Sequence, residues 1–353
     1  MIIPTEPIGS IPRPDYLQDA LAEFESGRGN QEALDACRDR ATAETIARFE
    51  ETGSPVVVDG EQSKPSFLGY PLQGLTGLAP DGAVIPFADG HTRRLPRLSG
   101  GPFRYGVRAA SYVAKAKALT DKPVKQAVIA PSLLSLLYPA GGIDGYSREA
   151  FLSDLADESE ADIRGCLDAG AESVQLDFTE GRLALKLDPS KGLLRDFVAI
   201  NNSVLDRFSA EERSKLGVHT CPGGDQDSAH SLDVDYAELL PDLFRLNVGT
   251  FYVQLAGEPD RPRVLGLLRE HSAPDQRIFV GVIDPIDPRV ETPEEVRDRV
   301  VEAARYIPVE RLGTCDDCGF SPFADDRSTS RDTAFAKIAA RIAGTRLAAE
   351  ALG

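Results

Sequence analysis

A histidine and two cysteines are the residues of this sequence best suited to hold a metal ion. His219 and Cys221 occupy alternate positions of the segment LGVHTCPGGD, residues 216–225. On a β-strand, side chains two residues apart project from the same face, so the imidazole and the thiol would point to one place. Much further along the chain, the segment LGTCDDCGFSPF supplies Cys315 and Cys318. Imidazole and thiolate are typical zinc ligands, and three protein ligands with one open position form a catalytic zinc site.

These motifs also have other interpretations. The His-x-Cys pair alone is compatible with ordinary core packing, and the Cys-x-x-Cys spacing of residues 315–318 also occurs in redox pairs. A structural site with four cysteine ligands would need two more cysteines nearby, whereas Cys37 and Cys166 lie in segments of helical pattern and are expected to be core filler. The occurrence of both motifs at predicted strand ends favours a Zn²⁺ site of the catalytic kind.

The elements that must position these residues follow an alternating pattern. Short apolar runs alternate with longer segments of helical period, which is typical of a parallel α/β sheet or barrel. The expected strands cover residues 2–9, 55–60, 125–131, 172–177, 216–221, 250–255, 277–284 and 311–314. The expected helices cover residues 31–52, 147–169, 194–208, 236–246, 261–270, 293–306 and 329–352. This pattern predicts an α/β protein in which residues 1–353 form a single (β/α)8 TIM barrel, with its active site at the carboxyl ends of the strands.

One segment departs from this rhythm. Residues 62–121, between the second and third expected strands, are rich in glycine and proline and contain a hairpin-like stretch over residues 82–98. Long structured loops in compact domains usually carry function, so this insertion is a candidate lid over the barrel mouth. A surface insertion without a role at the site is the alternative.

Charge and composition exclude several classes of partner. Lys and Arg number 39 and Asp and Glu 56, which gives a net charge of −17. Such a surface repels phosphate backbones and anionic lipids, so we expect neither nucleic-acid nor membrane binding. The first residues lack the pattern of a signal peptide, and the five cysteines do not form a disulfide framework, which together predict a cytoplasmic protein. The acidic surface is compatible with a monomer or a homo-oligomer.

Several motifs, in order along the chain, resemble one family. They are IGSIPRP (8–14), VVVDGE (56–61), VQLDF (174–178), HTC (219–221), GVIDPIDPRVETPEEV (281–296) and DDCG (316–319). Nearly the whole chain is similar to the catalytic barrel of cobalamin-independent methionine synthase and its single-barrel relatives, a group similar in architecture to uroporphyrinogen decarboxylase. The resemblance implies that His219, Cys221 and Cys318 bind catalytic Zn²⁺, and that Cys315 is either a bystander or a residue that supports the ligands.

The same resemblance implies a binding site for homocysteine. Matching positions are Ile8, Gly9, Ser10 and Glu61 for its carboxylate and amino group, with Asp177 as a second acid for the amino group. Backbone N–H groups and a hydroxyl suit a carboxylate, and two anionic oxygens suit an ammonium. The alternative for the two acids is that residues at strand ends often cap the next helix.

Three positions depart from the family pattern. Gln254 stands where the family has a fourth, glutamate zinc ligand, and Glu258 follows four residues later. Ile286 replaces a histidine thought to protonate the departing group, and His230 is the candidate to take over that catalytic role. The chain has no Trp on which a folate pterin would stack, so we expect a methyl donor other than polyglutamyl folate.

The resemblance therefore predicts a zinc-dependent thiol alkyltransferase. A zinc-bound substrate thiolate would attack an electrophilic carbon, most simply in methyl transfer to homocysteine or a similar small thiol. Two other enzymes remain open, namely an epoxyalkane:coenzyme M transferase, with Arg104, Arg108 or Arg182 for the sulfonate, and a decarboxylase-like barrel without metal. A metal carrier without turnover is an alternative outside the enzymes.

Overall fold

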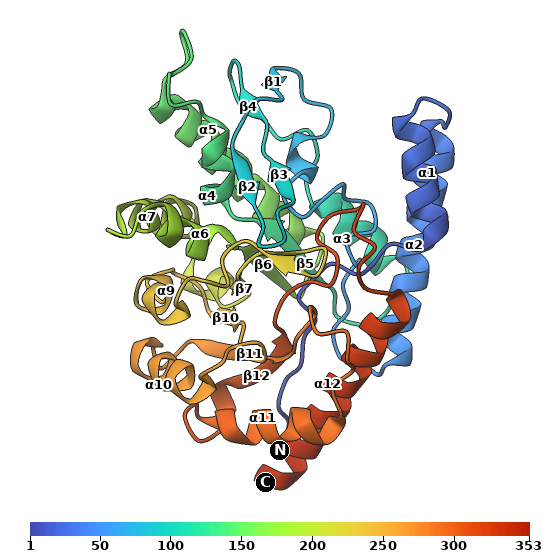
Figure 1. The fold of residues 1–353 in the computed structure, drawn as a ribbon, viewed down its shortest axis with the longest axis vertical. Coiled ribbons are helices and arrows are strands. Elements are labelled where there is room, and N and C mark those ends of the chain that lie inside the picture. Colours follow the sequence, from blue (N-terminus) through green and yellow to red (C-terminus); the bar gives the residue numbers. More distant parts are fainter.

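A six-stranded parallel β-sheet forms the centre of the computed structural model, which describes residues 1–353 (Figure 1). Its strands are β5 (Lys125–Ile129), β6 (Ser173–Asp177), β7 (Leu216–Thr220), β10 (Thr250–Val253), β11 (Arg277–Ile283) and β12 (Leu312–Asp316). They pair in the order β12-β11-β10-β7-β6-β5, so each strand lies beside the next one of this set along the chain. The sequence prediction of six of the eight strands is thus confirmed within a few residues.

The two remaining predicted strands, residues 2–9 and 55–60, are wrong as full strands. Each forms one parallel bridge, Thr5 with Thr314 and Val57 with Val124, at opposite edges of the sheet. Prolines at positions 4, 7 and 55 explain the short pairing, because proline has no N–H to give to a ladder. The backbone N–H of Ile11 donates to the carbonyl of Gly60 at 3.0 Å, so a hydrogen bond connects the two segments that continue the sheet edges.

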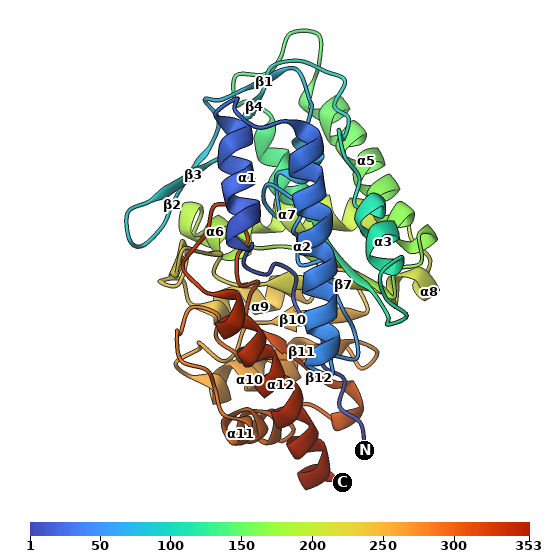
Figure 2. The same cartoon turned by 90° about the vertical axis from the view of Figure 1, so that its right-hand side faces the viewer.

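Helices surround the sheet, as Figures 1 and 2 show. The predicted helices are present as α2 (Gln31–Glu51), α5 (Arg148–Asp168), α7 (Gly192–Leu205), α9 (Tyr236–Leu243), α10 (Arg261–His271), α11 (Pro293–Ala303) and α12 (Arg331–Leu352). The sequence analysis missed α1 (Asp15–Glu25), α3 (Ala110–Lys117), α4 (Pro131–Leu134), α6 (Glu180–Leu187) and α8 (Ala210–Arg213). Thr292 caps α11 in a reciprocal capping box with Glu295, which agrees with the helix start expected there.

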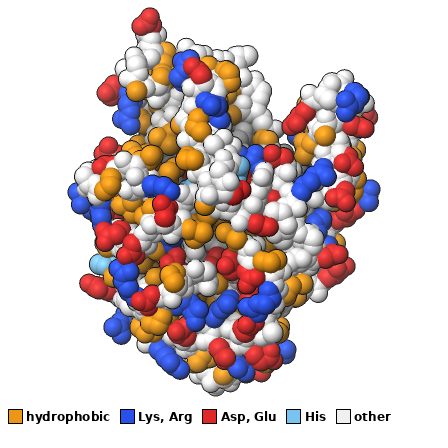
Figure 3. Space-filling view, viewed as in Figure 1, with side chains coloured by type: hydrophobic (Ala, Val, Ile, Leu, Met, Phe, Trp, Pro, Cys, Tyr) orange, Lys and Arg blue, Asp and Glu red, His pale blue; other side chains and the backbone are white.

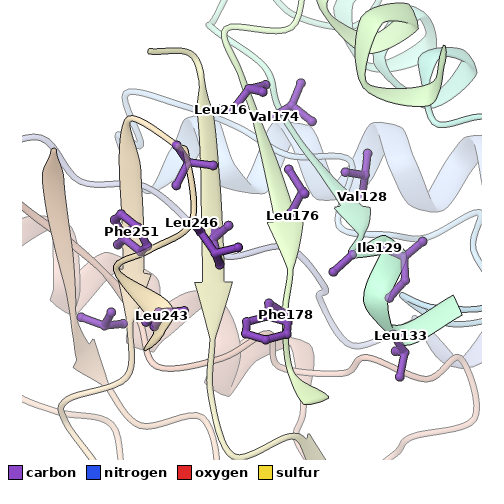
Figure 4. Close-up of a cluster of buried hydrophobic side chains, with 14 of the residues drawn as sticks. Val128, Ile129, Leu133, Val174, Leu176, Phe178, Leu216, Leu243, Leu246 and Phe251 are labelled. Atoms are coloured by element: carbon purple, nitrogen blue, oxygen red, sulfur yellow. The ribbon is translucent and has the colours of Figure 1, made fainter. Parts of the chain in front are cut away.

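The main hydrophobic core lies between the strands and these helices. Every residue of β5, β7 and β10 is buried, which is typical of parallel strands covered on both faces. Figure 4 shows part of this core, including Val128, Leu176, Leu216 and Phe251 from four neighbouring strands. Cys166 belongs to the same core, as predicted, whereas Cys37 is partly buried against the small cluster of α1 and α2.

Residues 62–121 form a short 3-10 helix (Tyr70–Leu72), two small antiparallel ribbons and α3. β1 (Leu78–Ala79) pairs with β4 (Arg97–Leu98), and β2 (Val84–Pro86) pairs with β3 (Thr92–Arg94), which confirms the hairpin expected over residues 82–98. The β2–β3 hairpin extends from the body of the protein in Figure 2. It contacts the ribbon that follows β7, formed by β8 (Gly224–Asp225) and β9 (Ser228–Ala229), through the Ala88 N–H, which donates to the Ala229 carbonyl at 3.2 Å.

Acidic and basic side chains are interspersed on the face of the molecule in Figure 3, where no large basic area is visible. Among the helices, none combines the length and the apolar character needed to cross a bilayer.

Candidate functional site

His219, Cys221 and Cys318 meet at the carboxyl ends of β7 and β12. Their ligand atoms all lie within 4.8 Å of one another, and the two sulfur atoms are 3.1 Å apart. Both ring nitrogens of His219 are buried without a hydrogen-bond partner. Buried polar atoms are nearly always paired, so an imidazole without partners beside two thiols fits a metal centre.

The backbone around each of these residues explains their convergence. His219 and Cys221 stand two residues apart at the end of β7, so their side chains share one direction. The chain then turns at Gly223, whose φ of 73° favours glycine, and the Gly223 N–H donates to the Cys221 sulfur at 3.4 Å. Cys318 is held from the other side, because the carboxylate of the preceding Asp317 accepts three backbone N–H groups from residues 255–257.

Cys315 lies apart from this cluster, as the sequence analysis expected. It is fully buried with Ile8, Tyr252 and Phe279, and its thiol donates to the Phe279 carbonyl at 3.6 Å. Burial raises the pKa of the Cys315 thiol well above its ordinary value. The sulfur nearest to Cys318 therefore belongs to Cys221, so the Cys-x-x-Cys spacing does not mark a redox pair.

The two candidates for a fourth ligand have different surroundings. The Glu258 carboxylate pairs with Arg182, whose guanidinium lies over the Tyr236 ring at 4.0 Å, so this acid already has a partner. Gln254 directly follows β10, and its backbone N–H reaches the Thr220 carbonyl at 3.4 Å, beside the His219–Cys221 segment. The Gln254 side-chain oxygen is buried without a partner, which leaves it free to act as a ligand.

The residues expected to bind substrate line one cavity with the cluster. Ile8, Gly9, Ser10, Glu61 and Asp177 border the same cavity as His219 and Cys318. The Ser10 hydroxyl accepts the Ser321 N–H at 3.2 Å, and the Ser10 carbonyl accepts the Phe320 N–H at 2.9 Å. Segments from the two ends of the chain are therefore joined directly beside Cys318.

Glu61 and Asp177 are buried acids with unequal partners. Glu61 has a φ of 58°, one of its carboxylate oxygens accepts from the Lys64 ammonium at 2.9 Å, and the other has no partner. Asp177 accepts from the Gln175 amide at 2.7 Å. Burial raises the pKa of Asp177 to about 6, against an opposing effect of His219. No side chain caps the start of α6, so the capping role considered for Asp177 is absent.

His230 also lines the cavity and is buried. Its Nδ1 lies 2.7 Å from the Ser231 hydroxyl, and its ring packs edge-on against Phe87 at 5.5 Å between centroids. Burial, followed by the positive charges of Lys186 and Arg182, lowers the pKa of His230 to about 4. The imidazole is therefore uncharged at neutral pH.

Sequence reasoning missed much of the cavity wall. Leu133 of α4, and Glu180 and Leu183 of α6, line it, together with Phe67, Leu68, Ile85, Phe87 and Arg93 from residues 62–121. The signal available for Glu180 was its place three residues after Asp177, but α6 was not predicted. None of Arg104, Arg108 and Arg182 is among the residues that line the cavity.

Comparison with known proteins agrees with this geometry. Residues 3–340 match the family described as the cobalamin-independent synthase catalytic domain. The methionine synthase of Saccharolobus solfataricus is 23% identical over 354 residues, which cover 99% of this chain and 96% of that protein. The methionine synthase of Sulfurisphaera tokodaii is 25% identical, over 99% of this chain and 94% of that protein.

Solved structures share the fold. A B12-independent methionine synthase from Shewanella sp. W3-18-1, in complex with selenomethionine, superimposes with a TM-score of 0.79 at 20% identity, covering 100% of this chain and 99% of that one. A methyltransferase from Methanosarcina mazei gives a TM-score of 0.51 at 14% identity, covering 97% and 94%. The chain belongs to the cobalamin-independent methionine synthase catalytic domain family.

Proposed function

We propose that this protein is a zinc-dependent thiol methyltransferase whose methyl acceptor is homocysteine. The observation that carries the proposal is the shared cavity, in which His219 and Cys318 of the metal-binding cluster lie with Glu61, Asp177 and residues 8–10. A metal site and a set of groups suited to an amino acid thus face one space.

His219, Cys221 and Cys318 are the proposed zinc ligands, with Gln254 as the fourth. Bound Zn²⁺ would lower the pKa of a thiol ligand and so keep it as a nucleophilic thiolate at neutral pH. The buried imidazole without partners and the two adjacent sulfurs support this ligand set, because neutral imidazole and thiolate are preferred by Zn²⁺.

The remaining residues hold the amino-acid part of the substrate. In this proposal Ile8, Gly9 and Ser10 bind the carboxylate, and Glu61 and Asp177 bind the ammonium. Glu61 has one carboxylate oxygen without a partner, and Asp177, with a pKa of about 6, is mainly ionised at neutral pH. His230 is proposed to orient the reactants as a neutral hydrogen-bonding group, since burial disfavours its protonated form.

We further propose a complete (β/α)8 barrel architecture in which residues 62–121 act as a lid over the site. Residues of this segment line the cavity, and its β2–β3 hairpin is tied to the β8–β9 ribbon by His91, whose Nε2 lies 3.0 Å from the Asp225 carboxylate. Opening of this hairpin would give substrates access to the cluster.

Coenzyme M is a less suitable thiol than homocysteine for this cavity. A sulfonate needs a free cation, whereas Arg182 is paired with Glu258, and the arginines at 104 and 108 are paired with acids of α5. A decarboxylase that works without metal would leave the His-Cys-Cys cluster without a role.

A thiol-binding experiment tests the proposal. Calorimetric titration of the zinc-loaded protein should show homocysteine binding with release of its thiol proton, and much weaker binding of coenzyme M. Methylation of homocysteine should then follow with one of a panel of methyl donors, detected as methionine by mass spectrometry. Stoichiometric zinc without any binding of homocysteine would reject the proposal and favour the metal carrier.

A further inference from the structure

The cavity that holds the metal cluster has a largely apolar wall. Its apolar side chains come from residues 62–121, from α4 and α6, and from the segment after β12, and they are Leu68, Ile85, Phe87, Leu133, Leu183 and Phe323. A wall of this kind favours a ligand with an apolar body, because binding removes apolar surface of both the ligand and the wall from water.

This wall offers no free positive charge. Arg93 is the one lysine or arginine that lines the cavity, and its guanidinium donates to Asp225 at 3.1 Å and to Asp325 at 2.9 Å. The same guanidinium lies over the Phe323 ring at 4.0 Å. The Lys64 ammonium compensates the charge of Glu61, whereas Asp177 adds a negative charge that no lysine or arginine pairs with, so an anionic ligand would meet a like charge without a free cation.

Glu180 supplies the wall with a hydrogen-bonding group. One of its carboxyl oxygens accepts from the Ser132 hydroxyl, and the other is buried without any partner. Ser132 is itself fixed, because its backbone N–H donates to the Asn201 side-chain oxygen at 3.0 Å. Burial, supported by the nearby Asp177, raises the pKa of Glu180 to about 8, against the opposing effect of Ser132. Glu180 therefore carries a proton at neutral pH and can donate it to a ligand.

Resting on the proposed methyl transfer, we propose that this cavity binds an uncharged methyl ether as the methyl donor and that Glu180 is the acid that protonates its departing oxygen. An ether oxygen is an uncharged acceptor, which suits both the apolar wall and a carboxyl group that has one oxygen without a partner. Neutral His230 leaves the role of proton donor to Glu180.

The step balances in atoms and charge. A bond forms between the homocysteine sulfur and the methyl carbon while the bond between that carbon and the ether oxygen breaks. The Glu180 proton moves to the oxygen, which leaves as an alcohol or phenol. The proton that the thiol lost passes to water, and Glu180 regains a proton from water. In the net reaction, a thiol and an ether become a thioether and an alcohol.

Binding of two matched probes tests whether the cavity prefers an uncharged methyl ether. Anisole and 4-methoxybenzoate carry the same methyl ether, but the second adds a negative charge. Ligand-observed NMR on the full-length, zinc-loaded protein should show anisole binding at least about tenfold more tightly than 4-methoxybenzoate, because like charges oppose the second probe. Equal binding of both probes, or no binding of anisole, would overturn the inference.

Transfer from anisole with a trideuterated methyl group tests the role of Glu180. The wild type should give trideuterated methionine from homocysteine, and Glu180→Gln should lower this rate by about 100-fold or more, the range for loss of a general acid. The variant should keep the anisole Kd within threefold, which also verifies its fold. Glu158→Gln is the matched control, because Glu158 is a buried glutamate outside the cavity that accepts from the Tyr105 N–H at 3.1 Å.

The outcomes separate this inference from the proposed function. Undiminished methyl transfer in Glu180→Gln, or anisole binding without methyl transfer in the wild type, would overturn the inference. The proposed function would still stand if homocysteine binds and accepts a methyl group from another donor. If homocysteine itself does not bind to the zinc-loaded protein, the proposed function fails first.

Discussion

Replacement of Cys318 by serine tests the metal-binding cluster in isolation. The variant removes one of three proposed protein ligands and leaves His219 and Cys221 on β7. Loss of a group that merely supports a ligand lowers metal affinity by about 10–100-fold, so loss of a ligand itself should cost at least about 100-fold, or about 2.7 kcal/mol. Zinc affinity should be measured by competition with a chromophoric chelator in the full-length protein.

Cobalt provides a second observable for the same variant. Two thiolates bound to Co²⁺ give a charge-transfer absorption, and Cys318→Ser should reduce its intensity by about half because one of two thiolates is lost. Cys315→Ser is the matched control, since this thiol contacts the Phe279 carbonyl at 3.6 Å rather than the cluster. The reasoning would be refuted by an unchanged cobalt spectrum of Cys318→Ser, or by an equal loss of metal affinity in Cys315→Ser.

Three further changes test individual residues. Asp177→Asn should weaken homocysteine binding by about 10–100-fold in calorimetry, the equivalent of a charged hydrogen bond of about 1.5–3 kcal/mol, and an unchanged Kd would remove Asp177 from the substrate site. The fold lowers the pKa of His230 from 6.5 to about 4, so between these pH values the side chain stays neutral in the folded protein and takes up a proton in the unfolded chain. The free energy of unfolding of the metal-free protein should therefore fall by about 3 kcal/mol as the pH is lowered from 6.5 to about 4. In urea unfolding experiments, His230→Gln should lack this loss of stability at low pH, and the control His271→Gln should keep it. If the stability of His230→Gln depends on pH in the same way as that of the wild type, the assignment is contradicted. Gln254→Glu should tighten zinc binding, because a carboxylate adds negative charge beside the ion, and unchanged affinity would show that position 254 is not a ligand.

The central strands were predictable because each one is a short, mainly apolar run, and only Ser173 of β6 and Arg277 of β11 are not buried. At the sheet edges the same reasoning failed, since residues 2–9 and 55–60 have a strand-like composition but also contain prolines that interrupt the ladder. Helix α1 was missed although residues 15–25 have an amphipathic pattern, and it packs mainly on α2 through the small cluster of Leu17, Leu34 and Ala41. Helix α6 was missed because Gly181, near its start, has a low helix propensity.

The metal cluster was predictable for a different reason. The alternation of His219 and Cys221 fixes their common direction on a strand, and a parallel arrangement brings the end of β12 to the same rim. The partners of Glu180 and Glu258 were not predictable, because Ser132 is 48 residues from Glu180 and Arg182 is 76 residues from Glu258 in the chain. Their pairing depends on tertiary packing alone.

X-ray absorption at the zinc edge tests the central claim most directly, since it counts the sulfur and nitrogen atoms bound to the ion. For the zinc-loaded protein we predict two sulfur ligands, one imidazole nitrogen and one oxygen from Gln254, and a rise to three sulfurs when the homocysteine thiolate takes the place of Gln254. A sulfur count that stays at two in the presence of saturating homocysteine, or a site without cysteine sulfur, would contradict the account.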